Sequence, residues 1–239
     1  MGSFVLVHGA WHGGWCWEKV TPLLEEAGHR VDAIDLPGHG ANPAAVADMT
    51  LEAYARHVAD RVEAASEPVV LVGHSMGGMS VTQAAELVPD RIGTIVYVTA
   101  FLPNDGQSLL QLADGDPEAL VLPNIVVDEA AGLSTVREEA RRDAFYGECS
   151  AELAAWASAQ NVPESLQATA APVHLTDERA GSVRRIYVEC TRDRAISIGK
   201  QREMLAARPC EQVLTIDTDH SPFLSTPEEL AGHLFAAAG

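Results

Sequence analysis

Lysine is almost absent from this chain, and its scarcity excludes several classes of protein. Lys19 and Lys200 are the only two lysines, and 16 basic residues against 34 acidic ones give a formal net charge of −18. A surface of this kind repels nucleic acid and anionic membranes. We therefore expect neither as a partner, and polyanionic substrates are disfavoured for the same reason.

Long apolar runs and paired cysteines are also missing. No stretch approaches the roughly 18 consecutive apolar residues that make a membrane helix. The chain opens almost at once on the apolar run 4–7, which leaves no room for a signal peptide. The four cysteines are widely spaced without a C-x-x-C pair, so thiols in a reducing compartment are expected rather than disulfides or a metal site. These absences predict a cytoplasmic protein.

What the chain does contain is a series of short apolar runs that alternate with helical patterns. Six strands are predicted, at residues 4–7, 30–36, 69–72, 92–99, 183–190 and 212–217. The alternation predicts an α/β fold with a mostly parallel, doubly wound sheet of about six strands.

The region between the fourth and fifth predicted strands has a different pattern. It holds only short helical patches, at 108–112, 135–145, 150–159 and 163–168, and Thr135 with Glu138 would form a capping box at the start of the second. We therefore predict a core made of residues 1–103 and 183–239. Residues 104–182 are predicted to form a helical cap over the strand ends.

The third predicted strand runs directly into Gly-His-Ser-Met-Gly-Gly, residues 73–78, and then into a helical pattern. A strand, a tight turn and a helix are the context in which Gly-x-Ser-x-Gly forms a nucleophile elbow. Only small residues fit at Gly73 and Gly77 in such a turn. We predict Ser75 as a nucleophile, the alternative being a glycine-rich turn that happens to contain a serine.

A serine hydroxyl needs a base within hydrogen-bonding reach, and in sharp-elbow hydrolases the base follows the serine in the chain. Three histidines lie beyond Ser75. His174 falls at the end of the insert and His233 inside the last predicted helix, where structural roles are expected. His220 directly follows the last strand, and functional sites of open α/β sheets gather at the carboxyl ends of strands. His220 is therefore the predicted base.

The base in turn needs an acid to orient it. Asp193 comes three residues after the fifth predicted strand and reaches the same carboxyl edge, whereas Asp217 and Asp219 are sequence neighbours of the histidine. A residue next to His220 points its side chain elsewhere, so Asp193 is the predicted acid. The alternative is a solvated loop position for Asp193.

Acyl transfer also needs donors aimed at the developing oxyanion. The amides of Met76, directly after the nucleophile, and of Ala10, in the glycine-rich loop after the first strand, are the predicted donors. Trp11 and His12 either line the pocket or pack beneath it. The residues expected at the substrate pocket are Gly9, Trp11, His12, Leu102, Phe145 and Trp156.

Several stretches together resemble the α/β-hydrolase superfamily and, within it, the methylesterase and hydroxynitrile lyase group with its bacterial esterases. They are residues 4–15, 73–78, 145–150, 172–178, 181–188, 190–196 and 219–225. The resemblance implies Ser75, Asp193 and His220 as a catalytic triad and Ala10 and Met76 as oxyanion donors. It also implies pocket walls from the insert and, since relatives are often dimers, a possible homodimer.

Two departures from the group bear on the reaction. Lyases of the group carry a threonine where this chain has Gly9 and a lysine where it has Ser221. Without a cation to stabilise departing cyanide, lyase chemistry loses its electrostatic support. We therefore expect a serine carboxylic-ester hydrolase that forms an acyl-serine from small, uncharged, fairly hydrophobic esters of methyl, aryl or carbamate type, with no cofactor or metal. The alternatives are hydroxynitrile lyase-type C–C cleavage and a ligand-binding protein with slow turnover.

Overall fold

A computed structural model describes residues 2–237 and contains a six-stranded parallel sheet. The strands follow the order β2-β1-β3-β4-β8-β9, and every neighbouring pair is parallel. Their bounds are β1 Ser3–Val7, β2 Arg30–Ile34, β3 Val69–His74, β4 Ile92–Val98, β8 Arg185–Cys190 and β9 Gln212–Ile216. The predicted six-stranded sheet is confirmed, and each strand end lies within two residues of its predicted bound.

The central strands are apolar along their whole length because both faces of the sheet are covered. All residues of β1 and β3 are buried, whereas β2 and β9 at the two edges are partly or fully exposed except for the last residue of each. A parallel sheet with helices on both faces has this pattern, since its inner strands have no solvated side. The unbroken apolar run before Ser75 is therefore a consequence of its central place in the sheet.

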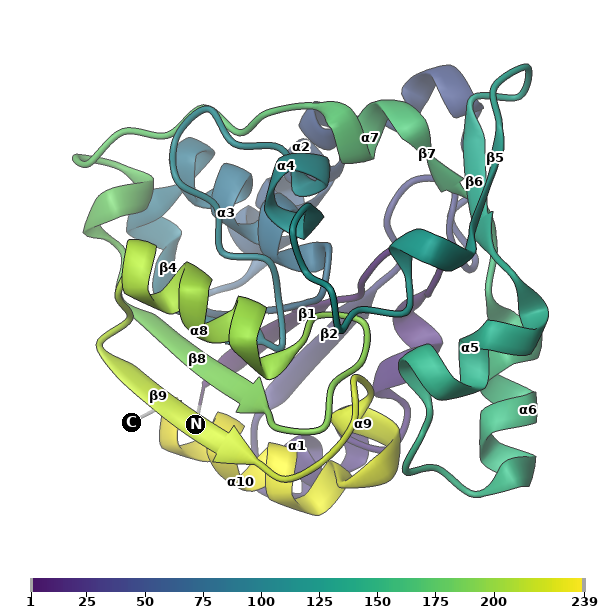
Figure 1. Ribbon diagram of the computed structural model, residues 1–239. Coiled ribbons are helices and arrows are strands. Elements are labelled where there is room, and N and C mark those ends of the chain that lie inside the picture. Colours follow the sequence, from purple (N-terminus) through teal and green to yellow (C-terminus); the bar gives the residue numbers. More distant parts are fainter. Residues whose placement is uncertain (1, 238–239) are drawn as a thin grey trace.

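Helices cover the sheet on both faces. Figure 1 shows α1 (Thr21–Glu26) and α10 (Pro227–Ala237) on one side and α2 (Leu51–Ala64) and α3 (Gly77–Leu87) on the other. Two further core helices are α8 (Ile198–Ala207) and the single turn α9 (Pro222–Ser225). No helix within residues 2–237 has the length and apolar character needed to span a bilayer.

The segment between β4 and β8 contains helices, as predicted, but also a small sheet that the sequence analysis did not predict. The helices are α4 Leu109–Ala113, α5 Glu138–Phe145, α6 Ala151–Gln160 and α7 Leu166–Ala170. The strands are β5 Ile125–Asp128, β6 Leu133–Val136 and β7 Glu164–Ser165, which pair antiparallel in the order β5-β6-β7. In Figure 1 the strands β5 and β6 and the helices α5 and α6 lie at the right, beyond the arrowheads of β8 and β9, whereas α4 and α7 lie at the top, next to α2.

The predicted capping box at Thr135 is wrong because Thr135 belongs to this small sheet and not to the start of a helix. Thr135 lies in β6 opposite Val126, and α5 begins after Arg137 without a side-chain cap. The inward side chains of β6 are Ser134 and Val136, so the strand lacks the regular apolar alternation that predicts a strand. β7 has only two residues, too few for any periodicity.

Candidate active site

Ser75 occupies a strained turn between β3 and α3. Its φ of +53° is in the left-handed region, which costs a non-glycine residue energy and is found mainly at functional sites. The backbone is held on both sides, because Ser75 O accepts from Gly78 N and Phe101 N, each at 3.0 Å. A Cβ on Gly77 would lie 2.7 Å from His8 O, so only glycine lets α3 start this close to the end of β1. The strand, turn and helix predicted around Ser75 are present.

Asp193 and His220 form a buried hydrogen-bonded pair at the carboxyl ends of β8 and β9. His220 Nδ1 lies 2.7 Å from Asp193 Oδ2. The other carboxylate oxygen, Oδ1, accepts from the amides of Ala195 at 2.6 Å and Ile196 at 2.9 Å. These amides fix the carboxylate, and an oriented carboxylate next to an imidazole selects the tautomer with a proton on Nδ1.

Thr99, which the sequence analysis missed, is a further partner of this pair. Its hydroxyl donates to Asp193 Oδ2, and its backbone directly follows β4 with a φ of +36°. Trp11, Ser75 and Thr99 are the three non-glycine residues within 2–237 that have positive φ. All three belong to this site. A polar residue at the end of a central strand is the signal that could have identified Thr99.

The two rival carboxylates point away from the imidazole nitrogens. Asp219 Oδ2 accepts from Glu148 N at 2.8 Å, and its Oδ1 accepts from Ser221 N at 3.0 Å. Burial raises the pKa of Asp219 although these hydrogen bonds oppose the shift. Asp217 is exposed and pairs with Arg192. Within residues 2–237, Asp193 is the carboxylate that reaches the ring of His220.

The two atoms that would exchange a proton are free of hydrogen bonds, both to each other and to any other group of the described chain. Neither Ser75 Oγ nor His220 Nε2 makes a hydrogen bond within residues 2–237, and Ser75 is 9% exposed. Such serine–histidine hydrogen bonds often tighten only when substrate is bound. His74 supports the imidazole from below: burial lowers its pKa, so the neutral ring donates from Nε2 to His220 O at 2.8 Å.

Two backbone amides beside Ser75 also have unused donors. Ala10 N and Met76 N donate to no group of the described chain, and both residues line the same cavity as Ser75. Met76 directly precedes α3, whose N-terminus favours negative charge. These are the two amides predicted as oxyanion donors.

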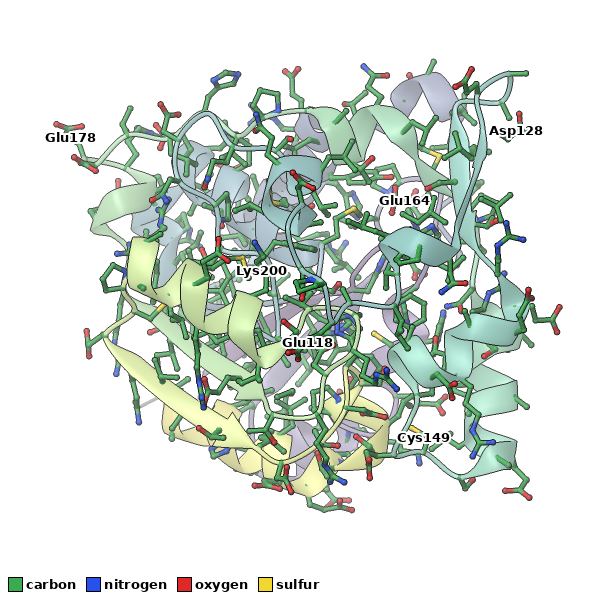
Figure 2. All side chains as sticks on the ribbon, viewed as in Figure 1. Glu118, Asp128, Cys149, Glu164, Glu178 and Lys200 are labelled. Carbon is green, nitrogen blue, oxygen red and sulfur yellow. The ribbon has the colours of Figure 1, made fainter. Side chains whose placement is uncertain are left out.

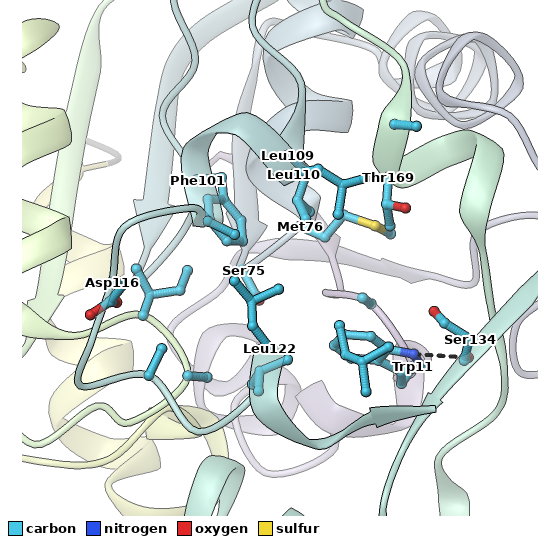
Figure 3. A pocket seen from close by; sticks show the side chains of 18 of the residues that line it. Trp11, Ser75, Met76, Phe101, Leu109, Leu110, Asp116, Leu122, Ser134 and Thr169 are labelled. Carbon is cyan, nitrogen blue, oxygen red and sulfur yellow. Dashed lines mark hydrogen bonds between the residues drawn. The ribbon is translucent and has the colours of Figure 1, made fainter. Parts of the chain in front are cut away.

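The cavity next to Ser75 has a volume of about 520 Å³ and apolar walls. In Figure 3, Ser75 lies between Asp116 on one side and Trp11, hydrogen-bonded to Ser134, on the other. Phe101 and Met76 contribute walls from the core, and Phe145 contributes a wall from the end of α5. The remaining wall comes largely from the insert, with Leu109, Leu110, Val121, Leu122, Ile125 and Val127.

Two of the six residues predicted at the substrate pocket line the cavity, and the other four lie outside it. Trp11 and Phe145 line the cavity. Gly9 lies beside the nucleophile instead, where a Cβ would come within 2.6 Å of Ser75 Cβ. His12 is fully buried behind the loop, its ring 5.5 Å from that of Phe145, and does not reach the cavity.

Leu102 and Trp156 also lie away from the cavity. Leu102 is buried, with its amide against Met204 Sδ, and its neighbour Phe101 lines the cavity in its place. Trp156 packs edge-on against Trp15, with ring centroids 5.3 Å apart. An apolar residue at a strand end is equally suited to core and cavity, so sequence alone could not distinguish these positions.

A second buried histidine–carboxylate pair lies outside the cavity. Glu164 of β7 lies in the interior, unlike the surface residues Asp128 and Glu178 (Figure 2), and its Oε2 is 3.1 Å from His39 Nε2. Tyr54 Oη of α2 donates to Glu164 Oε1 at 2.8 Å. Within the described residues, no group of three or more His, Cys, Asp or Glu side chains is arranged to hold a metal ion.

Comparison with known proteins identifies the class to which this fold and site belong. Residues 4–233 match the alpha/beta hydrolase family, and the chain belongs to that family.

More particular similarities concern esterases. Methylesterase 9 of Arabidopsis thaliana is 32% identical over an alignment of 268 positions that covers 100% of this chain and 98% of the relative. The crystal structure of polyneuridine aldehyde esterase superimposes with a TM-score of 0.90 at 30% identity and covers 100% of both chains. A pyrethroid hydrolase from Sphingobium faniae gives a TM-score of 0.89 at 30% identity, covering 99% of this chain and 97% of the other.

Proposed function

We propose that the protein hydrolyses small, uncharged, hydrophobic esters through an acyl-serine intermediate. That it is a hydrolase of the carboxylesterase type follows from its similarity to methylesterases and other ester hydrolases over its whole length. The observation that carries the finer proposal is the buried Asp193–His220 pair at the same sheet edge as the strained Ser75.

Each group of the site has a role in such a reaction. His220 Nε2 takes the proton of Ser75 Oγ as the oxygen attacks the ester carbonyl, and Asp193 stabilises the imidazolium that forms. The amides of Ala10 and Met76 donate to the oxyanion of the tetrahedral intermediate. The C–O bond to the alcohol breaks, and the alcohol leaves with the proton from His220. Water, deprotonated by His220, then attacks the acyl-serine, and the acid and free Ser75 are released.

The cavity supports an uncharged substrate. Its walls are mainly aliphatic and aromatic, and an apolar pocket gives little compensation for burying a charge. Lys200, a lysine among the lining residues, is already engaged by Asp114 O at 3.0 Å and Glu203 Oε1 at 3.1 Å. The names of two relatives, a methylesterase and polyneuridine aldehyde esterase, support an ester as the substrate.

The lyase alternative lacks a cation near the histidine. The position after His220 is Ser221, whose side chain is fully buried and whose Oγ has no hydrogen-bond partner. The ammonium of Lys200 is committed to the two partners described above. Departing cyanide would therefore find no free positive charge among the described residues that line the cavity.

The test of the nucleophile is labelling with a fluorophosphonate probe. The wild type should be labelled at Ser75, and Ser75→Ala should abolish both labelling and ester hydrolysis. Ser80→Ala is the matched control, because Ser80 is a buried serine of α3 whose Oγ has no partner, and it should label normally. Labelling that persists in Ser75→Ala would refute the assignment.

The substrate class is tested with p-nitrophenyl and methyl esters of increasing acyl length. We expect kcat/KM to rise with the apolar area of the ester until the cavity is filled, since each buried methylene contributes about 0.8 kcal/mol. Esters carrying a carboxylate should be poor substrates. A preference for such anionic esters would contradict the proposed substrate class.

A further inference from the structure

The loop that carries the predicted oxyanion donor Ala10 is held in place by the insert. Trp11 has a φ of +62°, and its carbonyl oxygen accepts from Val162 N at 3.0 Å and Asn161 Nδ2 at 3.1 Å. Its indole Nε1 donates to Ser134 O at 3.0 Å. These three hydrogen-bond partners come from segments more than 100 residues away in the chain, so the conformation of this loop depends on the docked insert.

His12 fixes the two peptide groups around Ala10. Its backbone amide donates to Gly9 O at 3.4 Å, and its ring Nδ1 is 2.7 Å from Ala10 O. Gly9 O also accepts from His8 Nδ1 at 2.8 Å. Because a trans peptide is planar, fixing Gly9 O also fixes the direction in which Ala10 N–H points.

The protonation of His12 determines the direction of the next hydrogen bonds. Burial lowers its pKa to about 3, so the imidazole is neutral. Since Nδ1 faces the carbonyl of Ala10, Nδ1 carries the proton and Nε2 is an acceptor. Tyr146 Oη, 2.8 Å away, must therefore donate to His12 Nε2.

Asn161 completes a closed network. Its amide Nδ2 donates one hydrogen to Tyr146 Oη at 3.1 Å and the other to Trp11 O at 3.1 Å. His12 and Tyr146 are almost fully buried, so a lost partner is not replaced easily by water. The network runs from the insert through His12 to the loop of Ala10, and none of its polar side chains lines the cavity.

We propose that Tyr146 and Asn161 are positioning residues that aim the Ala10 amide at the oxyanion by locking the ring of His12. The inference rests on the proposed ester hydrolysis. In the wild type, Tyr146 holds His12 Nε2 and Asn161 holds Trp11 O, so the amide of Ala10 is oriented before substrate arrives. Preorganised donors of this kind stabilise the transition state more than the bound substrate.

The experiment uses Tyr146→Phe, which removes one hydroxyl from the network, and Asn161→Asp, which removes both of its donors. We expect kcat to fall roughly 10-fold in the first and more in the second, below the 10²- to 10³-fold cost of deleting an oxyanion donor itself. KM should change little. The affinity for a trifluoromethyl ketone, whose adduct with Ser75 carries an oxyanion, should fall by the same factor as kcat/KM.

Tyr97→Phe is the matched control, because Tyr97 is buried and its Oη bonds to Thr82 Oγ1 at 2.7 Å outside this network. It should retain the wild-type kcat and ketone affinity, and its thermal stability should fall by about as much as that of Tyr146→Phe. If Tyr146→Phe does not fold, Asn161→Asp decides. If the wild type is active and labelled but both variants keep the wild-type kcat and ketone affinity, the positioning role is overturned and the proposed function stands. A wild type that neither hydrolyses esters nor labels at Ser75 would overturn the proposed function.

Discussion

Two regions of the molecule each contain a buried histidine bound to a carboxylate, and they differ in what the rest of the ring contacts. Asp193 and His220 meet at 2.7 Å at the end of the main sheet. Glu164 and His39 meet at 3.1 Å where the insert joins the core, and these four side chains are almost entirely buried. Burial and pairing alone therefore do not distinguish a catalytic pair from a structural one.

The second ring nitrogen makes the distinction. His39 Nδ1 lies 3.2 Å from Pro37 O, so both nitrogens of His39 face acceptors and both carry protons. Burial would lower the pKa of His39, but the hydrogen bond and charge of Glu164 outweigh it and raise the pKa. His220 leaves Nε2 without a partner in the described chain. We infer that His39 is an anchor and His220 a base.

The largest expected effect follows from removing the charge of the first pair. Asp193→Asn should lower kcat by about 10,000-fold, because the amide presents the wrong hydrogen-bonding group to Nδ1 and favours the other tautomer. Steady-state hydrolysis of a p-nitrophenyl ester measures this. The matched variant Glu164→Gln should keep kcat within a few-fold of wild type. Equal losses in the two variants would remove the distinction between the pairs.

Removing the charge of the second pair should instead destabilise the fold. Glu164 also accepts from Tyr54 Oη and Ser165 N, each at 2.8 Å, so Glu164→Gln leaves His39 and part of this network unmatched. We expect the free energy of unfolding in urea to fall by about 3 kcal/mol. A loss below about 0.5 kcal/mol would show that the pair is not an anchor.

Each of the two carboxylates also accepts a hydrogen bond from a hydroxyl group. The donor is Thr99 in the first pair and Tyr54 in the second. Thr99→Val should lower kcat about 10-fold with little change in KM, because Asp193 loses one of its four donors. Tyr54→Phe should leave kcat unchanged and lower the free energy of unfolding by about 1 kcal/mol. Kinetics and urea unfolding on both variants test this, and exchanged outcomes would contradict it.

The two regions were not equally predictable from sequence. Ser75, His220 and Asp193 each follow an apolar strand of a parallel sheet, where strand length, strand order and the carboxyl edge determine which residues meet. Their placement could therefore be predicted from local pattern. The contact between Asp193 and His220 joins two loops whose positions follow from this strand pattern.

The insert was predicted less well because its structure depends on tertiary contacts. Ser134 and Glu164 pair across β6 and β7 in strands too short for a periodic pattern. Glu164 in the sequence has the appearance of a solvated surface residue, and only the approach of Tyr54 and His39, more than 100 residues earlier, makes it a buried anchor. No local signal encodes such a contact.

The smallest predicted effect is the pH dependence of the second pair. The pKa of His39 is raised above its unfolded value near 6.5, so its contribution to stability is complete below about pH 6.5 and is lost as pH rises through the folded pKa. The charge of Asp35 adds to the rise in the pKa of His39, and the ring of His8, whose centroid lies 4.9 Å away, is itself kept neutral because burial lowers its pKa. The difference in unfolding free energy between wild type and His39→Gln should therefore shrink as the pH rises from 6 to 9. Urea unfolding of both proteins at each pH measures it. A difference that grows with pH would mean that His39 is neutral in the folded protein and that the two pairs differ in some way other than the use of the second nitrogen.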